Sequence, residues 1–358
     1  MARIAHFIQT RHSGGAERVV IDLGGALVRQ GHEVDVLHFG NEWIAKHAPQ
    51  AGFHAVQLSH RDWFVSKWSL APFVAYLTGV LRRRGVELLH SHLNGSIFAG
   101  ACASFFAGIP HVGTLHDVCH VQENRRNFRP LGMAARIGTR MVAVSEDMRA
   151  FYEQLAKGKI PIERIYNGVA MADAGVPRQQ RAKAFTFVSV GRLMPVKGFD
   201  ILLDALAATG TNGPHLRIAG EGRERSALEA RMRERGLHKR VEFLGFQQDI
   251  AGVLAGADAF VLASRSEGLS CSIAEAMAAG LPCIVTDVGG NRELVIDGTT
   301  GFLVPSEDVT ALAQRMRHLA DDRERAQRLG EAARQRAEAH FSIPVMVKSY
   351  DELYRALL

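Results

Sequence analysis

The chain has 358 residues, of which 47% are hydrophobic and 22% charged, an ordinary balance for a globular protein and a length that suggests two domains. No apolar run is long enough to cross a bilayer and no signal-peptide cleavage pattern is visible, so we expect a cytoplasmic protein. The four cysteines lack the C-x-x-C spacing of a zinc site, and we expect reduced thiols.

The first half of the chain carries the whole net charge of +6. Residues 1–170 contain 19 Lys and Arg against 13 Asp and Glu, whereas the remainder has 24 of each kind. No basic run is interleaved with stacking aromatic residues on a nucleic-acid module, so we expect no nucleic-acid partner. The basic half points instead to an anionic membrane surface or an acidic acceptor.

Short β-branched or aromatic runs alternate with helical patterns along the chain. Strands are predicted at residues 4–9, 34–39, 88–90, 111–115 and 141–144, and then at 186–190, 216–219, 241–244, 259–262, 283–286 and 302–304. This βα repetition predicts an α/β fold with two Rossmann-like, doubly wound parallel sheets, joined by the polar linker 170–183. Ligands bind beyond the carboxyl ends of such strands, so we expect the active site in a cleft between the domains.

Three features follow the strands of the first half. Gly14 and Gly15 are expected at the start of a helix that follows the first strand. There a ligand can approach the backbone closely, and the helix N-terminus favours an anion. The alternative is a simple turn between strand and helix. His116 directly follows the strand at 111–115, and Asp117 or the backbone could fix its tautomer, although most of the 16 histidines should be structural. Cys119 with His120 is disfavoured as a nucleophilic pair, because no third orienting group is visible.

The segment 63–84 has the composition of a helix that lies on a membrane surface. It combines seven bulky apolar or aromatic side chains, from Trp63 to Leu81, with the basic residues Lys67, Arg82, Arg83 and Arg84. A core helix with a basic last turn is the alternative, and this arrangement also suits the helix dipole.

Two cations follow the first strand of the second half. Arg192 and Lys197 lie five residues apart in a loop with Gly and Pro, where they could converge on a diphosphate and neutralise the charge that develops as it leaves. Lys197 lacks the neighbours of a P-loop lysine. Solvated surface charges are the alternative.

Residues 267–286 predict a loop, a short helix and a buried strand. Glu267 is expected in the loop and Glu275 in the helix, so that the two flank the free backbone N–H groups of residues 269–273, which can hold a phosphate. Carboxylates bind vicinal hydroxyls well, so the arrangement suggests a sugar nucleotide. In the alternative, Glu275 closes a capping box with Ser272 and Glu267 is solvated.

With these residues in view, the chain resembles a family 4 retaining glycosyltransferase of the two-domain GT-B fold, with a match that runs almost from end to end. The motifs that carry the resemblance in the first half are H-S-G-G-A-E-R at 12–18, H-S-H at 90–92, T-L-H-D at 114–117, V-S-E at 144–146 and Y-N-G-V at 166–169. Those of the second half are V-G-R-L-x3-K-G-F-D at 190–200, A-G-E-G at 219–222, F-L-G at 243–245 and E-G-x6-E-A-M-A-A-G-L-P at 267–282.

The resemblance implies an acceptor domain at 1–170, completed by a returning helix at 345–358, and a donor domain at 171–344. It also implies a role for each site residue. Arg192 and Lys197 would hold the donor diphosphate, Glu275 the ribose hydroxyls and Glu267 the transferred sugar. The remaining implied contacts are Gly268, Leu269 and Ser270 beside the phosphate, Gly245 and Phe246 around the base, His116 at the donor sugar, and Gly14 and Gly15 at the diphosphate.

The implied reaction moves a sugar from a nucleotide-diphosphate sugar to a hydroxyl of a glycan or lipid-linked acceptor with retention of configuration, as in cell-surface polysaccharide synthesis. No cofactor or metal is expected, since the chain contains no D-x-D, and a UDP-sugar is favoured over a GDP-sugar. The protein would be cytoplasmic, with peripheral contact at the inner membrane face. The alternatives are a GT-B sugar-nucleotide epimerase and a non-catalytic sugar-nucleotide-binding protein.

Overall fold

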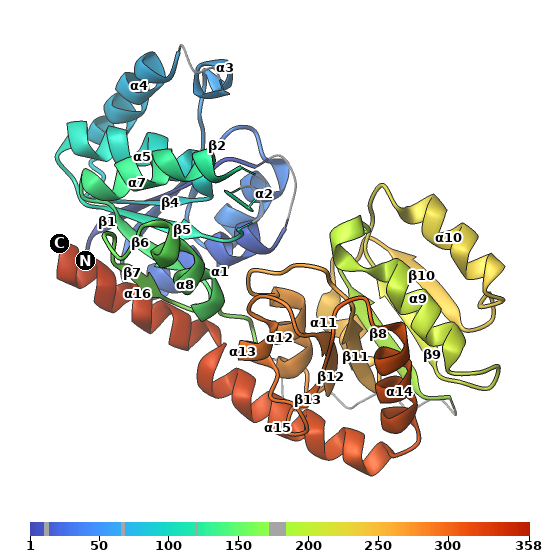
Figure 1. Cartoon of the computed structure of the whole chain (residues 1–358). Coiled ribbons are helices and arrows are strands. Elements are labelled where there is room, and N and C mark those ends of the chain that lie inside the picture. The colour runs from blue at the N-terminus through green and yellow to red at the C-terminus, as the bar shows by residue number, and fades with distance from the viewer. Residues whose placement is uncertain (11–13, 66–68, 119–120, 123, 172–183) are drawn as a thin grey trace. The chain divides into compact units, whose positions relative to one another are not determined.

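The structure, a computed structural model, describes residues 1–10, 14–65, 69–118, 121–122, 124–171 and 184–358. Contacts divide the chain into two compact units, Met1–Gly168 with Ile343–Leu358, and Val169–Ser342. Each unit is a parallel sheet covered by helices (Figure 1). Most of the predicted linker 170–183 lies outside the described residues. Among the helices that are described, none is long and apolar enough to span a membrane.

The first unit is built on a seven-stranded parallel sheet with the order β3-β2-β1-β4-β5-β6-β7. Its strands are β1 (Arg3–Ile8), β2 (Glu33–His38), β3 (His54–Gln57), β4 (Leu88–His92), β5 (His111–Leu115), β6 (Arg140–Ala143) and β7 (Ile162–Arg164). Its helices are α1 (Gly15–Arg29), α2 (Glu42–Gln50), α3 (Arg61–Val65), α4 (Leu70–Arg83), α5 (Asn94–Ala107), α7 (Phe128–Arg136), α8 (Glu146–Leu155) and α16 (Ile343–Leu357), with a 3-10 turn η1 (Arg125–Asn127).

Helix α16 completes the first unit, although it follows the second unit in the chain. It lies beside α1 (Figure 1) and buries two tyrosines against the sheet. The Tyr354 hydroxyl lies 2.6 Å from Nδ1 of His90, and the Tyr350 hydroxyl lies 2.9 Å from the hydroxyl of Thr114. Burial raises the pKa of both phenols, so they remain neutral hydrogen-bonding groups.

Helix α4 is a core helix, so the prediction that the apolar side chains of 63–84 form a membrane face is wrong for this helix. Phe73, Leu77 and Leu81 are fully buried in a cluster with residues of β1, β2 and α5. Arg84 hydrogen-bonds the buried carboxylate of Asp35 at 2.7 and 2.8 Å, so it is engaged within the protein. Residues 66–68 of the segment lie outside the described residues.

The second unit has a six-stranded parallel sheet with the order β10-β9-β8-β11-β12-β13. Its strands are β8 (Thr186–Val190), β9 (His215–Ala219), β10 (Val241–Gly245), β11 (Ala259–Leu262), β12 (Cys283–Thr286) and β13 (Gly301–Val304). Its helices are α9 (Phe199–Ala208), α10 (Arg225–Glu234), α11 (Ile250–Ala255), α12 (Cys271–Ala278), α13 (Asn291–Leu294), α14 (Val309–Ala320) and α15 (Arg323–His340), with a 3-10 turn η2 (Pro195–Lys197).

All eleven strands predicted from the sequence are present in the two sheets. The sequence analysis missed β3 and β7, which are the short edge strands of the first sheet. Both are only partly buried, so neither carries the continuous apolar run that marks a central parallel strand. In the second sheet β11 pairs directly with β8, which places the ends of these two strands side by side.

Candidate functional site

The loops that follow β8 and β11 bring two predicted site residues into contact. Nζ of Lys197 lies 2.6 Å from Oε1 of Glu267, and the hydroxyl of Ser264 donates to the same oxygen at 2.6 Å. The Glu267 side chain is only 9% exposed and that of Lys197 19%. The alternatives in which Lys197 is a solvated surface charge and Glu267 is solvated are therefore wrong for these two residues.

A glycine lets these two loops touch. Gly198 has a φ of 63°, and a Cβ at this position would lie 1.9 Å from the carbonyl oxygen of Ala263. The loops are also tied by a backbone bond from Arg265 N–H to Val196 O at 2.8 Å. The guanidinium of Arg265 then holds both carboxylate oxygens of Asp200, at 3.0 and 2.8 Å. Close backbone contact and a bidentate ion pair thus fix the position of Lys197.

The loop after β12 supports Glu267 from another side. A Cβ on Gly289, which has a φ of 51°, would lie 1.9 Å from the carbonyl oxygen of Glu267. Gly290 N–H donates to the carbonyl of Gly268 at 3.0 Å, and the Thr286 hydroxyl donates to that of Ser264 at 2.5 Å. Three loops at the carboxyl edge of the sheet therefore hold the backbone around Glu267.

Helix α12 begins directly after the loop that follows β11 and carries Glu267, with Ser270 as its N-cap residue. The first backbone bond of the helix runs from Ala274 N–H to Ser270 O, so the N–H groups of Cys271 to Ile273 precede the helical ladder and can face a ligand. Ser272 lies inside the helix, so the alternative in which it forms a capping box with Glu275 is wrong. Glu275 is half-buried on this helix, and Leu269 and Ser270 are buried.

Arg192, Gly245 and Phe246 lie at the carboxyl ends of strands β8 and β10, at the same edge of the second sheet. The Arg192 side chain is exposed, and among the described residues it makes no hydrogen bond or ion pair. Gly245 ends β10 with a φ of 70°, and the Phe246 ring that follows is 59% exposed. A free guanidinium and an exposed aromatic ring therefore lie at the end of the sheet that also carries Lys197 and Glu267.

In the first unit, Gly14, Gly15 and His116 also follow strand ends. Gly14 is the N-cap of α1 and Gly15 its first residue. His116, just after β5, is half-buried, and its Nε2 lies 3.1 Å from Nδ1 of His92. Burial lowers the pKa of His116 to about 4, so the ring is neutral at physiological pH.

The hydrogen-bond partner of His116 differs from the predicted one. The ring of His116 contacts His92, at the end of β4, and not Asp117 or the backbone as the sequence suggested. The carbonyl of Asp117 accepts instead from the Tyr152 hydroxyl at 3.0 Å. Cys119 and His120 lie outside the described residues.

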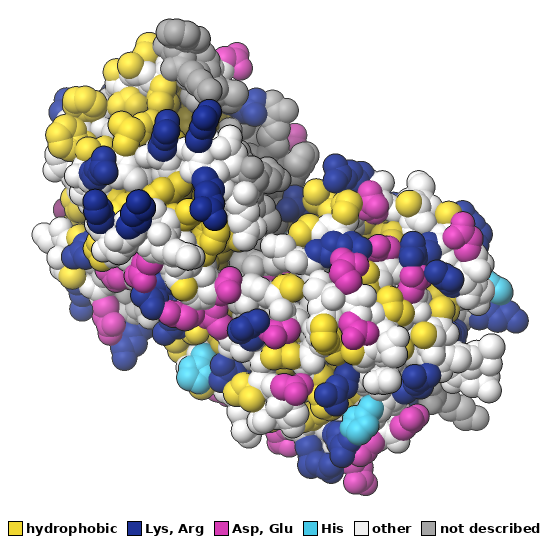
Figure 2. All heavy atoms as spheres, in the orientation of Figure 1, with side chains coloured by type: hydrophobic (Ala, Val, Ile, Leu, Met, Phe, Trp, Pro, Cys, Tyr) yellow, Lys and Arg dark blue, Asp and Glu magenta, His cyan; other side chains and the backbone are white. Residues whose placement is uncertain are grey.

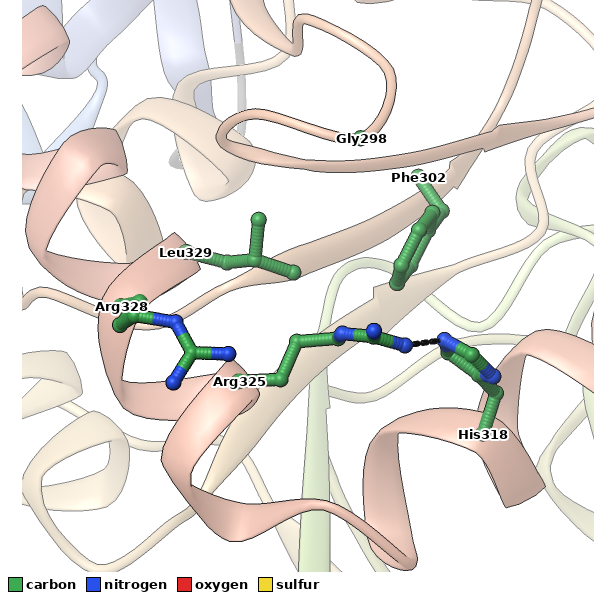
Figure 3. Close-up of a pocket in the computed structure, with 6 residues that line it drawn as sticks. All are labelled: Gly298, Phe302, His318, Arg325, Arg328 and Leu329. Carbon is green, nitrogen blue, oxygen red and sulfur yellow. Dashed lines mark hydrogen bonds between the residues drawn. The ribbon is translucent and has the colours of Figure 1, made fainter.

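A separate hollow in the second unit contains none of the predicted site residues (Figure 3). It lies between β13, α14 and α15 and is lined by Gly298, Phe302, His318, Arg325, Arg328 and Leu329. Arg325 and His318 contact each other across it, so two of its polar side chains already satisfy one another. The loops after β8, β11 and β12 therefore remain the candidate site of this unit.

Sequence reasoning missed Ser264, Arg265 and Gly289, which position Glu267 and its loop. Arg265 offered a signal, because it follows a predicted strand closely and could pair with the Asp of the K-G-F-D motif. Ser264 and Gly289 act through contacts between loops that are separate in the sequence, and no local pattern marks such contacts.

The fold and the site define a class of proteins. The structure of Anabaena Alr3699/HepE in complex with UDP-glucose is similar to this chain over 100% of both chains, with a TM-score of 0.87 and 25% identity. Together with the two parallel-sheet units, this similarity assigns the chain to the GT-B fold.

The sequence comparisons identify the family. The description "Glycosyltransferase Family 4" matches residues 13–173, and "Glycosyl transferases group 1" matches residues 177–336. The chain therefore belongs to the family 4, group 1 glycosyltransferases. It is 26% identical to the N-acetyl-alpha-D-glucosaminyl L-malate synthase of Bacillus anthracis, over 96% of this chain and 94% of the relative. It is 27% identical to the UDP-Gal:alpha-D-GlcNAc-diphosphoundecaprenol alpha-1,3-galactosyltransferase of Escherichia coli, over 68% of this chain and 69% of the relative.

Proposed function

We propose that this glycosyltransferase moves a sugar from a UDP-sugar to a hydroxyl of a glycan or lipid-linked acceptor, with retention of configuration and without a divalent metal. The observation that carries the proposal is the contact between Lys197 and Glu267 beside the start of α12. It joins a cation suited to a leaving diphosphate with a carboxylate suited to sugar hydroxyls. The similarity to a protein that binds UDP-glucose supports a UDP-sugar, and the Escherichia coli relative supports a lipid-linked acceptor.

In the proposed donor site, Arg192 and Lys197 bind the diphosphate with the N–H groups at the start of α12 and the backbone of Gly268, Leu269 and Ser270. Glu275 binds the ribose hydroxyls, and Gly245 with Phe246 contacts the base. In the first unit, Gly14 and Gly15 contact the diphosphate, and His116 contacts the donor sugar.

The proposed chemistry breaks the bond between the sugar C1 and the diphosphate oxygen, and the bonding electrons leave with the diphosphate. The acceptor oxygen bonds to C1 from the same face, and its proton passes to the departing phosphate. The alternative is a double displacement through Glu267. Oε1 of Glu267 already accepts hydrogen bonds from Lys197 and Ser264, which reduces the nucleophilicity of that oxygen. This favours Glu267 as an anchor for hydroxyls and a stabiliser of the developing charge.

A donor panel tests the proposal. UDP-sugars are expected to raise the midpoint of thermal unfolding, whereas GDP- and ADP-sugars leave it unchanged, because a ligand that binds only the folded state stabilises it. With an α-linked donor and an acceptor, the product should be α-linked and its rate of formation unchanged by EDTA. A β-linked product in the NMR spectrum would contradict retention, and an epimerised donor without transfer would contradict the proposed reaction.

The two glutamates should affect different steps. Glu275→Gln is expected to weaken UDP binding about tenfold, since a charged hydrogen bond to ribose is lost. Glu267→Gln should lower kcat with little change in UDP affinity, because Glu267 is proposed to bind the reacting sugar. Isothermal titration with UDP and steady-state kinetics measure the two effects, with the exposed Glu331→Gln as a control. UDP binding by Glu275→Gln that equals wild type would remove Glu275 from the ribose site.

We also propose that the first unit contacts an anionic membrane through the helices α4, α5 and α7. These helices and the turn η1 contain no Asp or Glu. Their surface exposes Phe105 and Phe106, each 61% exposed, and Met133, 53% exposed. Figure 2 shows hydrophobic and basic side chains together on this face. The exposed arginines there are Arg82, Arg83, Arg125, Arg126, Arg129 and Arg136. Apolar rings surrounded by cations suit a surface of anionic lipids.

Sedimentation with vesicles tests this surface. Vesicles of anionic lipid should carry the protein down at low salt and release it at high salt, and each basic residue near the surface should contribute about 1 kcal/mol. Replacing Arg126, Arg129 and Arg136 with Gln should weaken binding strongly. The control replaces Arg233 and Lys239, exposed basic residues of the second unit, with Gln. The proposed membrane contact would be contradicted if both variants lost the same share of vesicle binding, or if the wild-type protein did not bind the vesicles at low salt.

A further inference from the structure

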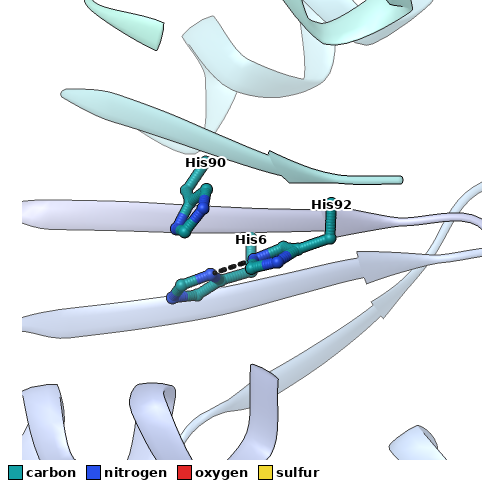
Figure 4. A group of neighbouring side chains, drawn as sticks. All are labelled: His6, His90 and His92. Carbon is teal, nitrogen blue, oxygen red and sulfur yellow. Dashed lines mark hydrogen bonds between the residues drawn. The ribbon is translucent and has the colours of Figure 1, made fainter. Parts of the chain in front are cut away.

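Three histidines of the first unit form a hydrogen-bonded chain that ends at His116. Nδ1 of His6, on β1, lies 3.1 Å from Nε2 of His92, at the end of β4 (Figure 4). Nδ1 of His92 in turn lies 3.1 Å from Nε2 of His116, after β5. His6 and His92 are fully buried, so the chain runs from the interior of the domain to the half-buried His116.

Each ring in the chain is neutral at physiological pH. Burial lowers the pKa of His6 to about 3, that of His116 to about 4, and that of His92 well below the ordinary value. A neutral imidazole has one N–H and one acceptor nitrogen. Because His92 uses both nitrogens in the chain, only two arrangements of protons allow both hydrogen bonds. Either every ring donates toward His116, or every ring donates toward His6.

The inner end of the chain distinguishes these two arrangements. Nε2 of His6 is buried and has no hydrogen-bond partner among the described residues. If the rings donated toward His6, this nitrogen would carry a buried N–H with no acceptor. If they donate toward His116, it is an acceptor without a donor. Orphaned buried N–H groups are rarer in proteins than under-satisfied acceptors, which favours donation toward His116.

We propose that His6 and His92 are positioning residues that hold His116 as the tautomer with its proton on Nδ1. His116 then offers an N–H donor at the nitrogen that makes no hydrogen bond within the described residues. The matching group on the substrate is an oxygen that accepts, such as a sugar hydroxyl oxygen. This inference rests on the proposed function, in which His116 contacts the donor sugar.

The same region could be read as a metal site, because nitrogens of His6, His90 and His92 lie within 4.8 Å of one another. The hydrogen bonds of His90 oppose that reading. Its Nδ1 lies 2.6 Å from the Tyr354 hydroxyl and its Nε2 lies 2.7 Å from the Thr114 hydroxyl. To bind there, a metal would have to break one hydrogen bond of His90 and one of the two hydrogen bonds that link His92 to His6 and His116.

Nitrogen NMR of the 15N-labelled full chain tests the proposal directly. The two-bond proton–nitrogen spectrum distinguishes protonated from unprotonated ring nitrogens, and His116→Gln identifies the His116 signals. In wild type, Nδ1 of His116 should be protonated and Nε2 unprotonated. The reverse pattern would overturn the proposal, and so would one tightly bound metal ion per chain in elemental analysis. Neither result depends on glycosyl transfer.

Variants of His92 test the positioning role. His92→Leu should release His116 to the Nε2-protonated form and lower kcat/KM about tenfold. His92→Asn should keep the Nδ1-protonated form of His116 and a kcat/KM within about threefold of wild type, because the Asn amide nitrogen can donate in place of Nδ1. His111, whose nitrogens contact Ser91 and Thr139 instead, should keep its tautomer in both variants.

The double variant His92→Leu/His116→Gln should be no less active than His116→Gln alone, since His92 acts through His116. An unchanged His116 tautomer in His92→Leu would overturn the positioning role. If His92→Leu does not fold, the wild-type spectrum still decides the tautomer. The predicted tautomer together with a fully active His116→Gln would instead contradict the proposed contact between His116 and substrate.

Discussion

Replacing Lys197 with alanine is expected to lower kcat/KM by a factor that corresponds to about 2 to 4 kcal/mol of transition-state stabilisation. The ammonium group is held beside Glu267 by two loops in close backbone contact, so its position is set before any ligand binds. A charge that is already oriented stabilises a leaving diphosphate without the cost of reorganisation. Arg192→Ala should lower kcat/KM by a similar factor, since its free guanidinium is proposed to bind the same diphosphate. Steady-state kinetics with saturating acceptor measures both effects.

The control for this experiment is Lys239→Ala, an exposed lysine of the same unit. Circular dichroism should show that all three variants are folded. Because Lys197 and Glu267 touch, the loss in Lys197→Ala/Glu267→Gln should be smaller than the sum of the single losses. Turnover close to wild type in both Lys197→Ala and Arg192→Ala would exclude the proposed diphosphate site.

Acidification is expected to unfold the first unit while the second remains folded. Burial lowers the pKa of six histidines of the first unit, namely His6, His38, His90, His92, His111 and His116. The pKa of each histidine is lower in the folded than in the unfolded chain. Above about pH 6.5 the histidines are neutral in both states. Below that pH the unfolded chain takes up protons that the folded unit does not, so the free energy of unfolding falls. Each histidine lowers the free energy of unfolding by about 1.4 kcal/mol for each unit by which the pH falls.

One carboxyl group of the first unit acts in the opposite direction. Burial raises the pKa of Asp22 to about 6, so its protonation favours the folded state and offsets about one histidine. The five histidines that remain lower the free energy of unfolding by roughly 7 kcal/mol per pH unit, which would exhaust a typical domain stability within about one to two units below pH 6.5. The first unit should therefore unfold between about pH 5.5 and pH 4.5.

Tryptophan fluorescence isolates this transition, because Trp43, Trp63 and Trp68 all belong to the first half of the chain. Hydrogen exchange of peptides from residues 184–342 follows the second unit. His340→Gln, an exposed histidine of the second unit, should leave the fluorescence midpoint unchanged. A single transition shared by both probes, or earlier unfolding of the second unit, would contradict the assignment of acid sensitivity to the buried histidines.

Much of the fold could be predicted from the sequence because parallel central strands are short, apolar and bounded by turns. The runs at 186–190 and 283–286 are of this kind and became β8 and β12. The order of the strands could not be predicted in the same way. Lys197 and Glu267 are 70 residues apart, and they meet because β11 pairs with β8, which is a property of the whole sheet.

The prediction for residues 63–84 failed for a related reason. Helical periodicity shows that Phe73, Leu77 and Leu81 form an apolar stripe. The same sequence pattern is expected whether the stripe packs in the protein core or faces a membrane, and in the structure it packs in the core. The basic and apolar surface of α5 and α7 was missed because Phe105 and Phe106 are adjacent in a helix whose apolar residues form no single stripe. Only the packing shows which of its side chains remain exposed.

The order in which the ribosome makes this chain differs from the order in which its parts can be completed. Helix α16 belongs to the first unit, yet it is translated only after residues 169–342. Until it emerges, His90 and Thr114 lack the tyrosine hydroxyls that they contact in the finished protein. The second unit can therefore finish folding while the first still waits for its last helix. A chain truncated near residue 342 would have a complete second unit joined to an unfinished first one, a target for chaperones and proteases.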